Sequence, residues 1–485
     1  MLWSPLGPDE GGYLAVARGW AAGATLYRDV WVDRPQGLLV LFRVWDWLSG
    51  GSAGSVRLMA MLFGAVLVVA TAVAVRTLTS EVAARVTAVV CAVVTSTPVL
   101  EGYAANGELL AGTVAVVAIA AGAVGVRQSR SLGWWFTVGV LAASAVSLKQ
   151  SAFDGLVVVG GWLTFAVLRH GPDRGAWVRR LGAFGAGMVV PIGVLMVHAG
   201  FTGWGRWWWA VAEYRMKTQS ALSSPDWHNL GRTAPVVTVA LGLVLVAAVC
   251  GASMIVADAV RAPRREFSGS VMLLVWPVVA AVAIMLGGGF WPHYWLQLGA
   301  PLSALAGVAL GRFRRLMPVL LTGILAPALA ISMWVYAGPR PTWMVRAADD
   351  WRAPLNERVA DWFDAHEPHP NLYVLCASAA LYAEAGAIPH YPYLWDVEVH
   401  HGPHAQRLLV DYIGDSARGP RFVAQFQSPA RCDSSGRVAR ILARDFHIVT
   451  RVSGVTILER NQPMTDARWR IGPRRLRGNA RSTVR

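Results

Sequence analysis

The sequence predicts a polytopic α-helical membrane protein with about ten spans, followed by a small α/β domain outside the membrane. Three observations support this fold class. Of the 485 residues, 55% are hydrophobic and only 15% are charged, and the mean hydropathy is +0.42, which is typical of polytopic membrane proteins. About ten apolar runs are each long enough to cross a hydrocarbon core of roughly 30 Å. After about residue 340 the hydropathy falls, and short β-like runs alternate with helical ones.

The chain opens with a polar and aromatic segment, Asp9 to Pro35, ahead of the first apolar run. Acids, arginines and aromatic rings are mixed in it, as on surfaces that bind sugars and phosphates. We therefore interpret residues 1–54 as an extracytoplasmic catalytic loop with interfacial helices. Its polar and aromatic members are Asp9, Glu10, Asp29, Asp33, Arg18, Arg28, Arg34, Tyr13, Trp20, Tyr27 and Trp31.

Apolar positions from Tyr13 onward recur at helical spacing, as in a helix lying flat in the membrane interface. The preceding pair, Gly11 and Gly12, lets the backbone come close to a ligand. Asp9 is then expected to project just before the helix begins. The alternative is that Asp9 is only an N-cap with Glu10 in the first turn, where acids are favoured in any helix.

The apolar runs define a transmembrane domain over residues 55–340. With the opening segment outside, the inside connections carry arginine, whereas the outside connections at 99–107 and 287–293 contain no Lys or Arg. This satisfies the positive-inside rule, and an even number of spans returns the C-terminal region to the outside. The runs lie near 55–76, 80–98, 108–126, 133–150, 152–168, 181–199, 233–257, 269–287, 294–310 and 317–337.

Residues 341–462 are predicted to form an extracytoplasmic α/β domain with a partly parallel sheet. No glycine-rich phosphate fingerprint occurs there, so no nucleotide is assigned to it. Residues 463–485 are rich in arginine without apolar periodicity and are expected to be disordered. The expected strands are 372–376, 421–426, 446–450 and 455–459, and the expected helices are 356–366, 405–415 and 436–444.

The formal charge of +15 comes from basic residues that lie mostly between the apolar runs and in the tail. This distribution favours membrane lipids as partners and gives no reason to expect nucleic acid. The four cysteines lack metal-type spacing. Cys91 and Cys250 fall in apolar runs, whereas Cys376 and Cys432 could form a disulfide outside the cell or remain two free thiols.

A second acidic site lies between the second and third apolar runs, on the same side as Asp9. It contains Glu101, Asn106 and Glu108, and we take Glu108 as the second candidate site residue. The alternative is a helix N-terminal acid, which the helix dipole favours. Carboxylates from two loops could bind a divalent cation through Asp9 and Glu108, so the sequence leaves metal use open.

Lys149 stands between two apolar runs, where an unneutralised lysine would cost a few kcal/mol. A lipid phosphate would neutralise it, and so would a local pair with Asp154. Farther along, three glycines precede His293 and Tyr294 at the outer end of a span. These two residues suit contact with phosphate or sugar, or simple packing at the interface.

Two aromatic segments outside the membrane have weaker patterns. The tryptophans of residues 200–232 predict an interfacial helix, for which membrane anchoring is a sufficient explanation. One loop of the C-terminal domain is crowded with polar and aromatic side chains without clean metal-ligand spacing, and acceptor recognition is the more economical interpretation. Its members are His390, Tyr391, Tyr393, Trp395, Asp396, Glu398, His400, His401 and His404.

The order of several short motifs resembles the GT-C glycosyltransferases. D-E-G-x-Y at Asp9, then G-x-x-L-Y-R-D-x-W, then R-P resemble their first extracytoplasmic loop. The similarity is to the family 39-like enzymes, which include protein O-mannosyltransferases and the lipid A aminoarabinose transferase. N-G-E at Glu108 and L-K-Q at Lys149 resemble further positions of these enzymes, and the resemblance covers roughly residues 9–310.

The sequence departs from this family in two places. The family usually has a membrane span ahead of the loop, but only eight residues precede Asp9 here. We expect that the true start lies upstream or that the first helix is absent. Gln36 follows Pro35 where relatives often have a second proline, which puts the exit of the loop in question.

The resemblance implies a plasma-membrane glycosyltransferase that moves a hexose or pentose from a polyprenyl-phosphate donor to an extracytoplasmic hydroxyl. The acceptor would be a cell-wall glycan, a glycolipid or a protein. Asp9 would act as general base in an inverting displacement, with Glu10 and Glu108 beside it. The donor phosphate would meet Lys149, Arg28 and Arg34, and the substrates would contact Tyr13, Tyr27, Asp29, His293 and Tyr294.

Two other functional classes remain open from the sequence. A transporter or flippase of lipid-linked sugars typically keeps ionisable sites at mid-membrane, but the apolar runs here are nearly free of charge and the acids collect in loops. A non-catalytic partner in cell-envelope assembly would tolerate loss of Asp9, whereas an enzyme would not.

Overall fold

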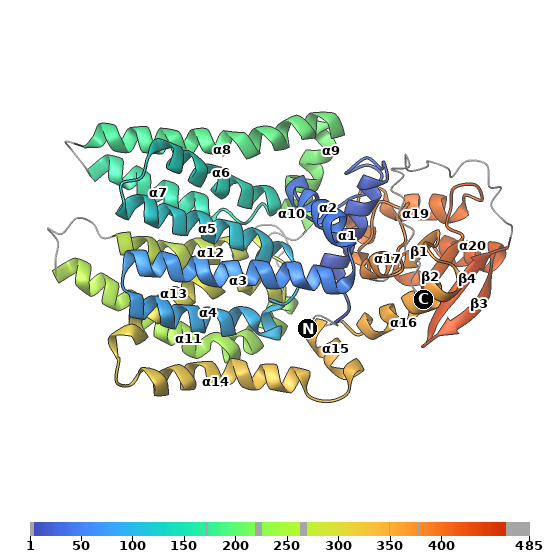
Figure 1. Cartoon of the computed structure of the whole chain (residues 1–485). Coiled ribbons are helices and arrows are strands. Elements are labelled where there is room, and N and C mark those ends of the chain that lie inside the picture. The colour runs from blue at the N-terminus through green and yellow to red at the C-terminus, as the bar shows by residue number, and fades with distance from the viewer. Residues whose placement is uncertain are drawn as a thin grey trace, which may run out of the picture.

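The computed structural model describes residues 4–169, 173–218, 226–261, 269–348, 350–376 and 378–461. The predicted basic tail lies outside these residues. Figure 1 shows a bundle of long helices lying side by side and, at one end of it, a domain that contains the β-sheet. The first two helices lie between these two parts, where the site described below is found.

Ten helices of the bundle coincide with the ten apolar runs. Six segments among the described residues are long and apolar enough to cross a membrane: α3, α5, α8, α11, α14, and α12 with the 3₁₀ turn η3 (Gly269–Val271) before it. The other four are 16 or 17 residues long, so the count of ten spans stays a prediction. The ten helices are α3 (Ala53–Leu78), α4 (Glu81–Ser96), α5 (Gly107–Arg127), α6 (Leu132–Leu148), α7 (Asp154–Arg169), α8 (Arg174–Thr202), α11 (Trp227–Arg261), α12 (Met272–Gly287), α13 (Leu296–Arg312) and α14 (Met317–Tyr336).

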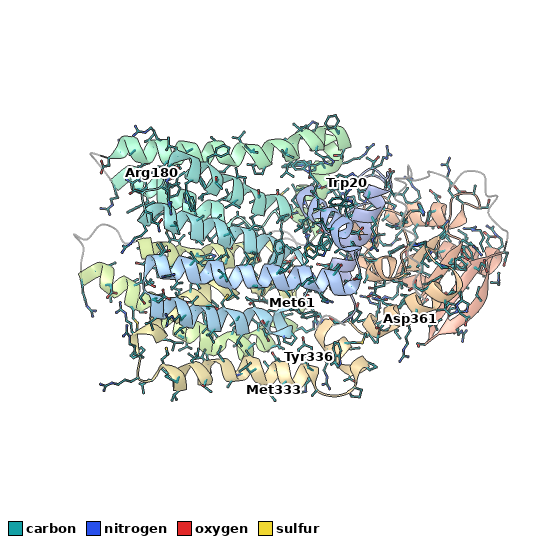
Figure 2. All side chains as sticks on the ribbon, viewed as in Figure 1. Trp20, Met61, Arg180, Met333, Tyr336 and Asp361 are labelled. Carbon is teal, nitrogen blue, oxygen red and sulfur yellow. A yellow bond between two sulfur atoms is a disulfide. The ribbon has the colours of Figure 1, made fainter. Side chains whose placement is uncertain are left out.

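The outer surface of the bundle is apolar. Met61 on α3 and Met333 on α14 are 52% and 76% exposed (Figure 2), as side chains facing lipid would be. Inside the bundle, helices meet at small residues, as expected where van der Waals packing drives association. A Cβ atom added to Gly139 of α6 would lie 2.0 Å from the Phe184 carbonyl oxygen of α8.

The helix of the opening segment begins earlier than its pattern indicates. Helix α1 (Pro8–Ala21) has Gly7 as its N-cap, so Asp9 lies in the first turn. Both the expectation that Asp9 precedes the helix and the alternative that it is the N-cap are therefore wrong. Pro8 explains the difference, because its fixed φ and missing N–H suit the first helical position. Helix α2 (Gln36–Ser49) follows.

Helix α1 packs against the C-terminal domain as well as against α2. A Cβ atom added to Gly11 would lie 2.5 Å from the Cα atom of Ala380, at the start of α17 (Ala380–Glu384). The Cβ of a residue at position 12 would lie 2.2 Å from the Trp395 ring. The two adjacent glycines thus permit close approach of another part of the chain.

The C-terminal domain contains a four-stranded sheet of order β1-β2-β4-β3. Strands β1 (Leu372–Leu375) and β2 (Phe422–Gln425) are parallel, and β3 (Phe446–Val452) and β4 (Val455–Arg460) add antiparallel pairs. The strands lie where the alternating pattern predicts them. The helices around the sheet are α16 (Ala353–His366), α17, α18 (Asp396–His401), α19 (Ala405–Gly414) and α20 (Arg437–Asp445), and α15 (Arg340–Ala348) connects the domain to α14.

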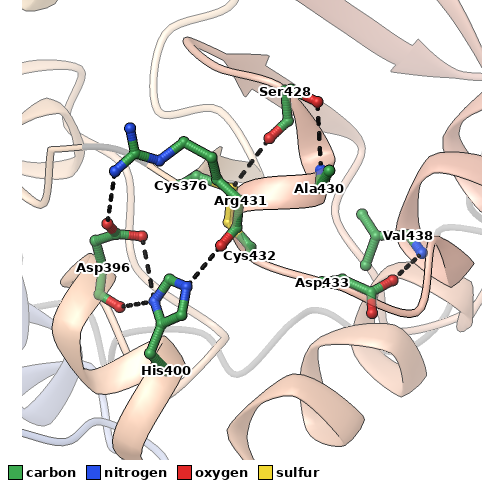
Figure 3. The surroundings of a disulfide bond; sticks show 9 residues. All are labelled: Cys376, Asp396, His400, Ser428, Ala430, Arg431, Cys432, Asp433 and Val438. Carbon is green, nitrogen blue, oxygen red and sulfur yellow. Dashed lines mark hydrogen bonds and ion pairs between the residues drawn. A yellow bond between two sulfur atoms is a disulfide. The ribbon is translucent and has the colours of Figure 1, made fainter.

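A disulfide joins Cys376, just after β1, to Cys432, which follows the short 3₁₀ turn η5 (Pro429–Arg431). The sequence left a disulfide or two free thiols open for this pair, and the structure contains the disulfide. Figure 3 shows that the disulfide-linked loop reaches α18 through His400. One ring nitrogen of His400 lies 2.6 Å from the Arg431 carbonyl oxygen, and the other lies 2.7 Å from the Asp396 carbonyl oxygen.

Candidate active site

A cavity of about 230 Å³ lies where α1, the loops at one end of the bundle and the C-terminal domain meet. Its lining is mixed, with carboxylates, cations and aromatic rings. The residues come from distant parts of the sequence: Gly7, Pro8, Asp9, Glu10, Tyr13, Asp33, Arg34, Glu101, Tyr103, Ala104, Asn106, Arg215, Trp291, His293, Tyr294, Asp350, Arg352, Ser378, Ala379, Trp395, Asp396, Val397 and Glu398.

Asp9 is the most accessible of the three predicted catalytic carboxylates, and its side chain is 31% exposed. It projects from the first turn of α1 into the cavity. The Tyr13 hydroxyl, one turn later, donates a hydrogen bond of 3.2 Å to Asp9 Oδ2, and His293 Nε2 lies 3.8 Å from the same oxygen. The carboxylate is therefore oriented, yet it can still meet a second molecule.

Glu10 is held by groups of the protein itself. It forms a buried ion pair with Arg57 of α3 and accepts backbone hydrogen bonds of 2.7 Å from Gly7 and 2.8 Å from Ala105. Its side chain is 1% exposed. These contacts join α1 to α3 and to the loop before α5, so Glu10 has a structural environment at the edge of the cavity.

Glu108, in the first turn of α5, has a fully buried side chain and pairs with Lys149 at the end of α6. This pair replaces the local pair with Asp154 that the sequence allowed. Neither Glu108 nor Lys149 lines the cavity. The Lys149 ammonium lies 4.4 Å from the centre of the Tyr294 ring, so it is placed behind the aromatic wall.

His293 lies between Asp9, Glu101 and Glu108. It lies in the short 3₁₀ helix η4 (Pro292–Trp295), with Nδ1 2.8 Å from Glu101 Oε2 and Nε2 3.7 Å from Glu108 Oε1. Burial opposes the charged imidazolium, but the carboxylates of Glu108, Glu101 and Asp9 outweigh it and raise the pKa of His293 to about 9. His293 is thus a cation at neutral pH, stabilised by its acidic neighbours.

The two candidate metal ligands, Asp9 and Glu108, both face His293 Nε2, with Asp9 Oδ2 at 3.8 Å and Glu108 Oε1 at 3.7 Å. Within the described residues, no group of three His, Cys, Asp or Glu side chains is arranged as a metal site.

The cavity lining also contains two arginines around one acid. Arg34 NH1 lies 2.7 Å from Asp33 Oδ1, and Arg215 pairs with the other carboxylate oxygen. Burial disfavours the charge on Asp33, but Arg215 and Arg34 hold its pKa below the ordinary value. Arg215 NH1 also donates a hydrogen bond of 2.9 Å to the Tyr294 hydroxyl. The result is a buried strip with excess positive charge.

Besides Glu108 and Lys149, three more of the predicted site residues do not line the cavity. Arg28 and Asp29 are adjacent in sequence and pair with each other at 2.7 Å, and their side chains are 53% and 41% exposed. Tyr27 is buried, and its hydroxyl donates to the Arg34 carbonyl oxygen at 2.8 Å. The reason is a compact turn, in which the Thr25 carbonyl oxygen accepts from Arg28 and Asp29 and directs both side chains outward.

Several cavity residues had no role assigned from the sequence. Arg215 belongs to the tryptophan-rich segment, where α9 (Trp204–Trp208), a π-helical turn η2 (Trp209–Glu213) and α10 (Tyr214–Thr218) turn back toward the site. Part of this segment packs on protein, since Trp207 is 8% exposed and donates to Gln36 Oε1. Arg57 does not line the cavity but pairs with Glu10 at its edge. The sequence contains a signal for this residue, since an arginine near the start of an apolar helix needs a partner.

Known protein structures resemble this one, although no protein-family model and no curated protein matches the sequence. The chain is similar to ArnT from Cupriavidus metallidurans bound to undecaprenyl phosphate, with a TM-score of 0.62 and 15% identity over 94% of both chains. It is also similar to the oligosaccharyltransferase from Archaeoglobus fulgidus tethered with an acceptor peptide. That match has a TM-score of 0.53 and 13% identity, over 95% of this chain and 71% of the other.

Both relatives are GT-C superfamily members, and the chain has the fold of these integral membrane glycosyltransferases. ArnT, the lipid A aminoarabinose transferase, is a structure that it matches over nearly the full length of both chains. The resemblance inferred from the motifs around Asp9 is thereby confirmed at the level of the fold.

Proposed function

We propose that this protein is a glycosyltransferase that moves a sugar from a polyprenyl-phosphate donor to an acceptor hydroxyl. The observation that carries the proposal is the cavity itself, whose lining contains one accessible carboxylate, Asp9, and a buried cationic strip of Arg34 and Arg215. A base and an anion site in one cavity are what a displacement at a sugar phosphate requires.

Asp9 is the general base in this mechanism. It accepts the proton of the acceptor hydroxyl while that oxygen attacks the anomeric carbon and the bond to the phosphate oxygen breaks. A single displacement inverts the anomeric configuration. The accessibility of Asp9 supports this assignment, because Glu10 and Glu108 are buried and already paired with Arg57 and Lys149.

Arg34 and Arg215 receive the leaving phosphate. Arg34 Nε is buried and has no hydrogen-bond partner among the described residues, so an anion in the cavity would satisfy it. Lys149 adds positive charge from behind Tyr294. Arg28, exposed and paired with Asp29, has no part in this step. Undecaprenyl phosphate bound to the similar ArnT supports a lipid phosphate as the ligand class.

The cavity would face the outside of a plasma membrane, in line with the positive-inside rule. Arg180 lies at the far end of the bundle from Trp20 and the C-terminal domain (Figure 2). The acids of the cavity gather at the opposite end. This separation of charge also favours an enzyme over a transporter, for which ionisable sites are expected at mid-membrane.

The proposal is tested by transfer of radiolabelled sugar from a panel of synthetic polyprenyl-phosphate donors in membranes that contain the protein. The decisive variant is Asp9→Asn, which keeps the size of the side chain but removes the base. Its matched control is Asp361→Asn, the same change at an exposed acid of α16. Size-exclusion chromatography in detergent checks that each variant is folded.

We expect Asp9→Asn to lose transfer by about 10² to 10⁴, the usual contribution of a general base, while Asp361→Asn keeps it. Unchanged transfer by Asp9→Asn would remove Asp9 from the mechanism. Absence of transfer by the wild type from every donor would contradict the enzyme and leave the transporter or assembly-partner classes.

A further inference from the structure

The C-terminal domain supplies one wall of the cavity, and the proposed chemistry does not use it. Ser378 and Ala379 form one part of this wall, and Trp395 and α18 form another, with Glu398 in the first turn of α18. The Trp395 ring packs on α1, with its centroid 5.9 Å from that of Tyr13. The wall is therefore held directly against the helix that carries Asp9.

Two polar atoms of this wall have no partner within the described part of the chain. Glu398 is 8% exposed and lines the cavity, and its Oε2 atom makes no hydrogen bond. The Nε1 group of Trp395 is also buried without an acceptor. Buried polar groups are nearly always hydrogen-bonded in native proteins, so an exception at a cavity indicates a ligand.

The charges around Glu398 narrow the chemistry of that ligand. The charges of Asp33, Arg215 and Asp9, which line the same cavity, act on the Glu398 carboxyl. Burial first, and then the Asp33 carboxylate, raise the pKa of Glu398 to about 8. A carboxyl group that is mostly protonated at neutral pH both donates and accepts hydrogen bonds. This group would meet a neutral polar ligand without introducing a full charge.

We propose that Trp395 and Glu398 form a sugar subsite, in which Trp395 Nε1 donates to one ring hydroxyl and the Glu398 carboxyl exchanges a hydrogen bond with another. The inference rests on the proposed function and names the part of the substrate that this wall holds. An isoprenoid chain would leave both polar atoms unpaired, and a phosphate is better served by Arg34 and Arg215. The sugar belongs either to the donor or to the acceptor.

Binding is measured first without any transfer step. Saturation-transfer-difference NMR on the purified full chain in detergent uses a panel of methyl glycosides as probes. The variants are Glu398→Met, which keeps the shape but removes the hydrogen bond, Glu398→Gln, which keeps part of it, and Trp395→Phe. The matched control for the last is Trp351→Phe, at a tryptophan that is 50% exposed.

We expect the wild type to bind at least one glycoside. Glu398→Met and Trp395→Phe should each weaken binding about 10-fold, as loss of one hydrogen bond to a ligand does. Glu398→Gln should keep an intermediate affinity, and Trp351→Phe should be unchanged. No glycoside signal from the wild type, or equal signals from all variants, would overturn the subsite.

Transfer kinetics then identify the source of the sugar. A rise in the donor KM alone, with unchanged binding of sugar-free polyprenyl phosphate, assigns the subsite to the donor sugar. A rise in the acceptor KM alone assigns it to the acceptor. Weaker binding of sugar-free polyprenyl phosphate by Glu398→Met would contradict a sugar subsite, because it would show that the residue supports the phosphate site.

Stability separates a ligand-binding role from a structural one. Glu398→Met removes a buried unpaired acceptor, so the thermal midpoint should stay constant or rise while glycoside binding falls. A midpoint that falls together with binding overturns the proposal.

The proposed enzyme and the proposed sugar subsite are contradicted by different results. Glu398-dependent glycoside binding without transfer would contradict the enzyme alone, and transfer unaffected by all three variants would contradict the subsite alone.

Discussion

Lys149 and Glu108 form an ion pair beneath the cavity in which neither side chain is more than 7% exposed. Lys149→Met leaves the Glu108 carboxylate buried with less compensation. We expect a loss of about 3 to 5 kcal/mol, the usual cost of removing one partner of a buried pair. The double variant Lys149→Met with Glu108→Gln should recover much of this loss, because no uncompensated charge remains. Thermal unfolding in detergent measures both, and equal midpoints for the single and double variants would contradict the pairing.

His293 should make stability depend on pH in the alkaline range. Its pKa in the folded protein is raised from 6.5 to about 9, so the imidazolium stabilises the fold. This contribution is fully present below about pH 6.5 and is lost as the pH rises through about 9. It corresponds to about 3 kcal/mol at most. The difference in thermal midpoint between wild type and His293→Gln should therefore shrink from pH 6 to pH 10, and a constant difference would show that His293 is neutral.

Gly11 should control the docking of the C-terminal domain. Gly11→Ala places a Cβ atom 2.5 Å from the Ala380 backbone, which cannot move without shifting α17. We expect weaker docking, visible as faster proteolysis between α14 and α16, and reduced transfer. Gly64→Ala is the matched control, because a Cβ there meets nothing within 4 Å and alanine favours a helix by up to about 1 kcal/mol. Equal proteolysis of both variants would contradict the contact.

The disulfide should stabilise the C-terminal domain. Cys376 and Cys432 are separated by 56 residues, and closing a loop of that length contributes about 4 kcal/mol in the chain-entropy account. We expect the double variant Cys376→Ser with Cys432→Ser to have a lower thermal midpoint than the wild type. Reductant should lower the midpoint of the wild type but not that of the double variant. Cys250→Ser, at an exposed free cysteine, should change neither. A reductant effect that persists in the double variant would point to another cause.

Local patterns in the sequence predict most of the helices and strands because each pattern is contained in one stretch of chain. The ten apolar runs coincide with helices, and the four strands of the C-terminal domain lie where alternation predicts them. The start of α1 is the exception in the opening segment. Pro8 is a signal for the earlier start, whereas the prediction placed Asp9 just before the helix.

The candidate site is less predictable because its contacts join residues far apart in the chain. Asp9 and Glu10 are adjacent in sequence, and only their contacts distinguish them. Glu10 is buried and paired with Arg57, whereas Asp9 faces the cavity. The charge of Arg28 favours contact with the donor phosphate, but the local turn directs its side chain outward. Arg215 lies in a tryptophan-rich segment that predicts only membrane anchoring. Composition cannot show that α10 turns back so that Arg215 pairs with Asp33.

The contact of Trp395 with α1 has a consequence for how the protein is made. The helix that carries Asp9 leaves the ribosome well before the wall that completes its cavity. Until α18 has been made, the carboxylate and arginines of the site exist without that wall. A chain that stopped after α14 would keep its membrane helices but would lack Trp395 and Glu398, so premature termination should yield a protein without the proposed sugar subsite.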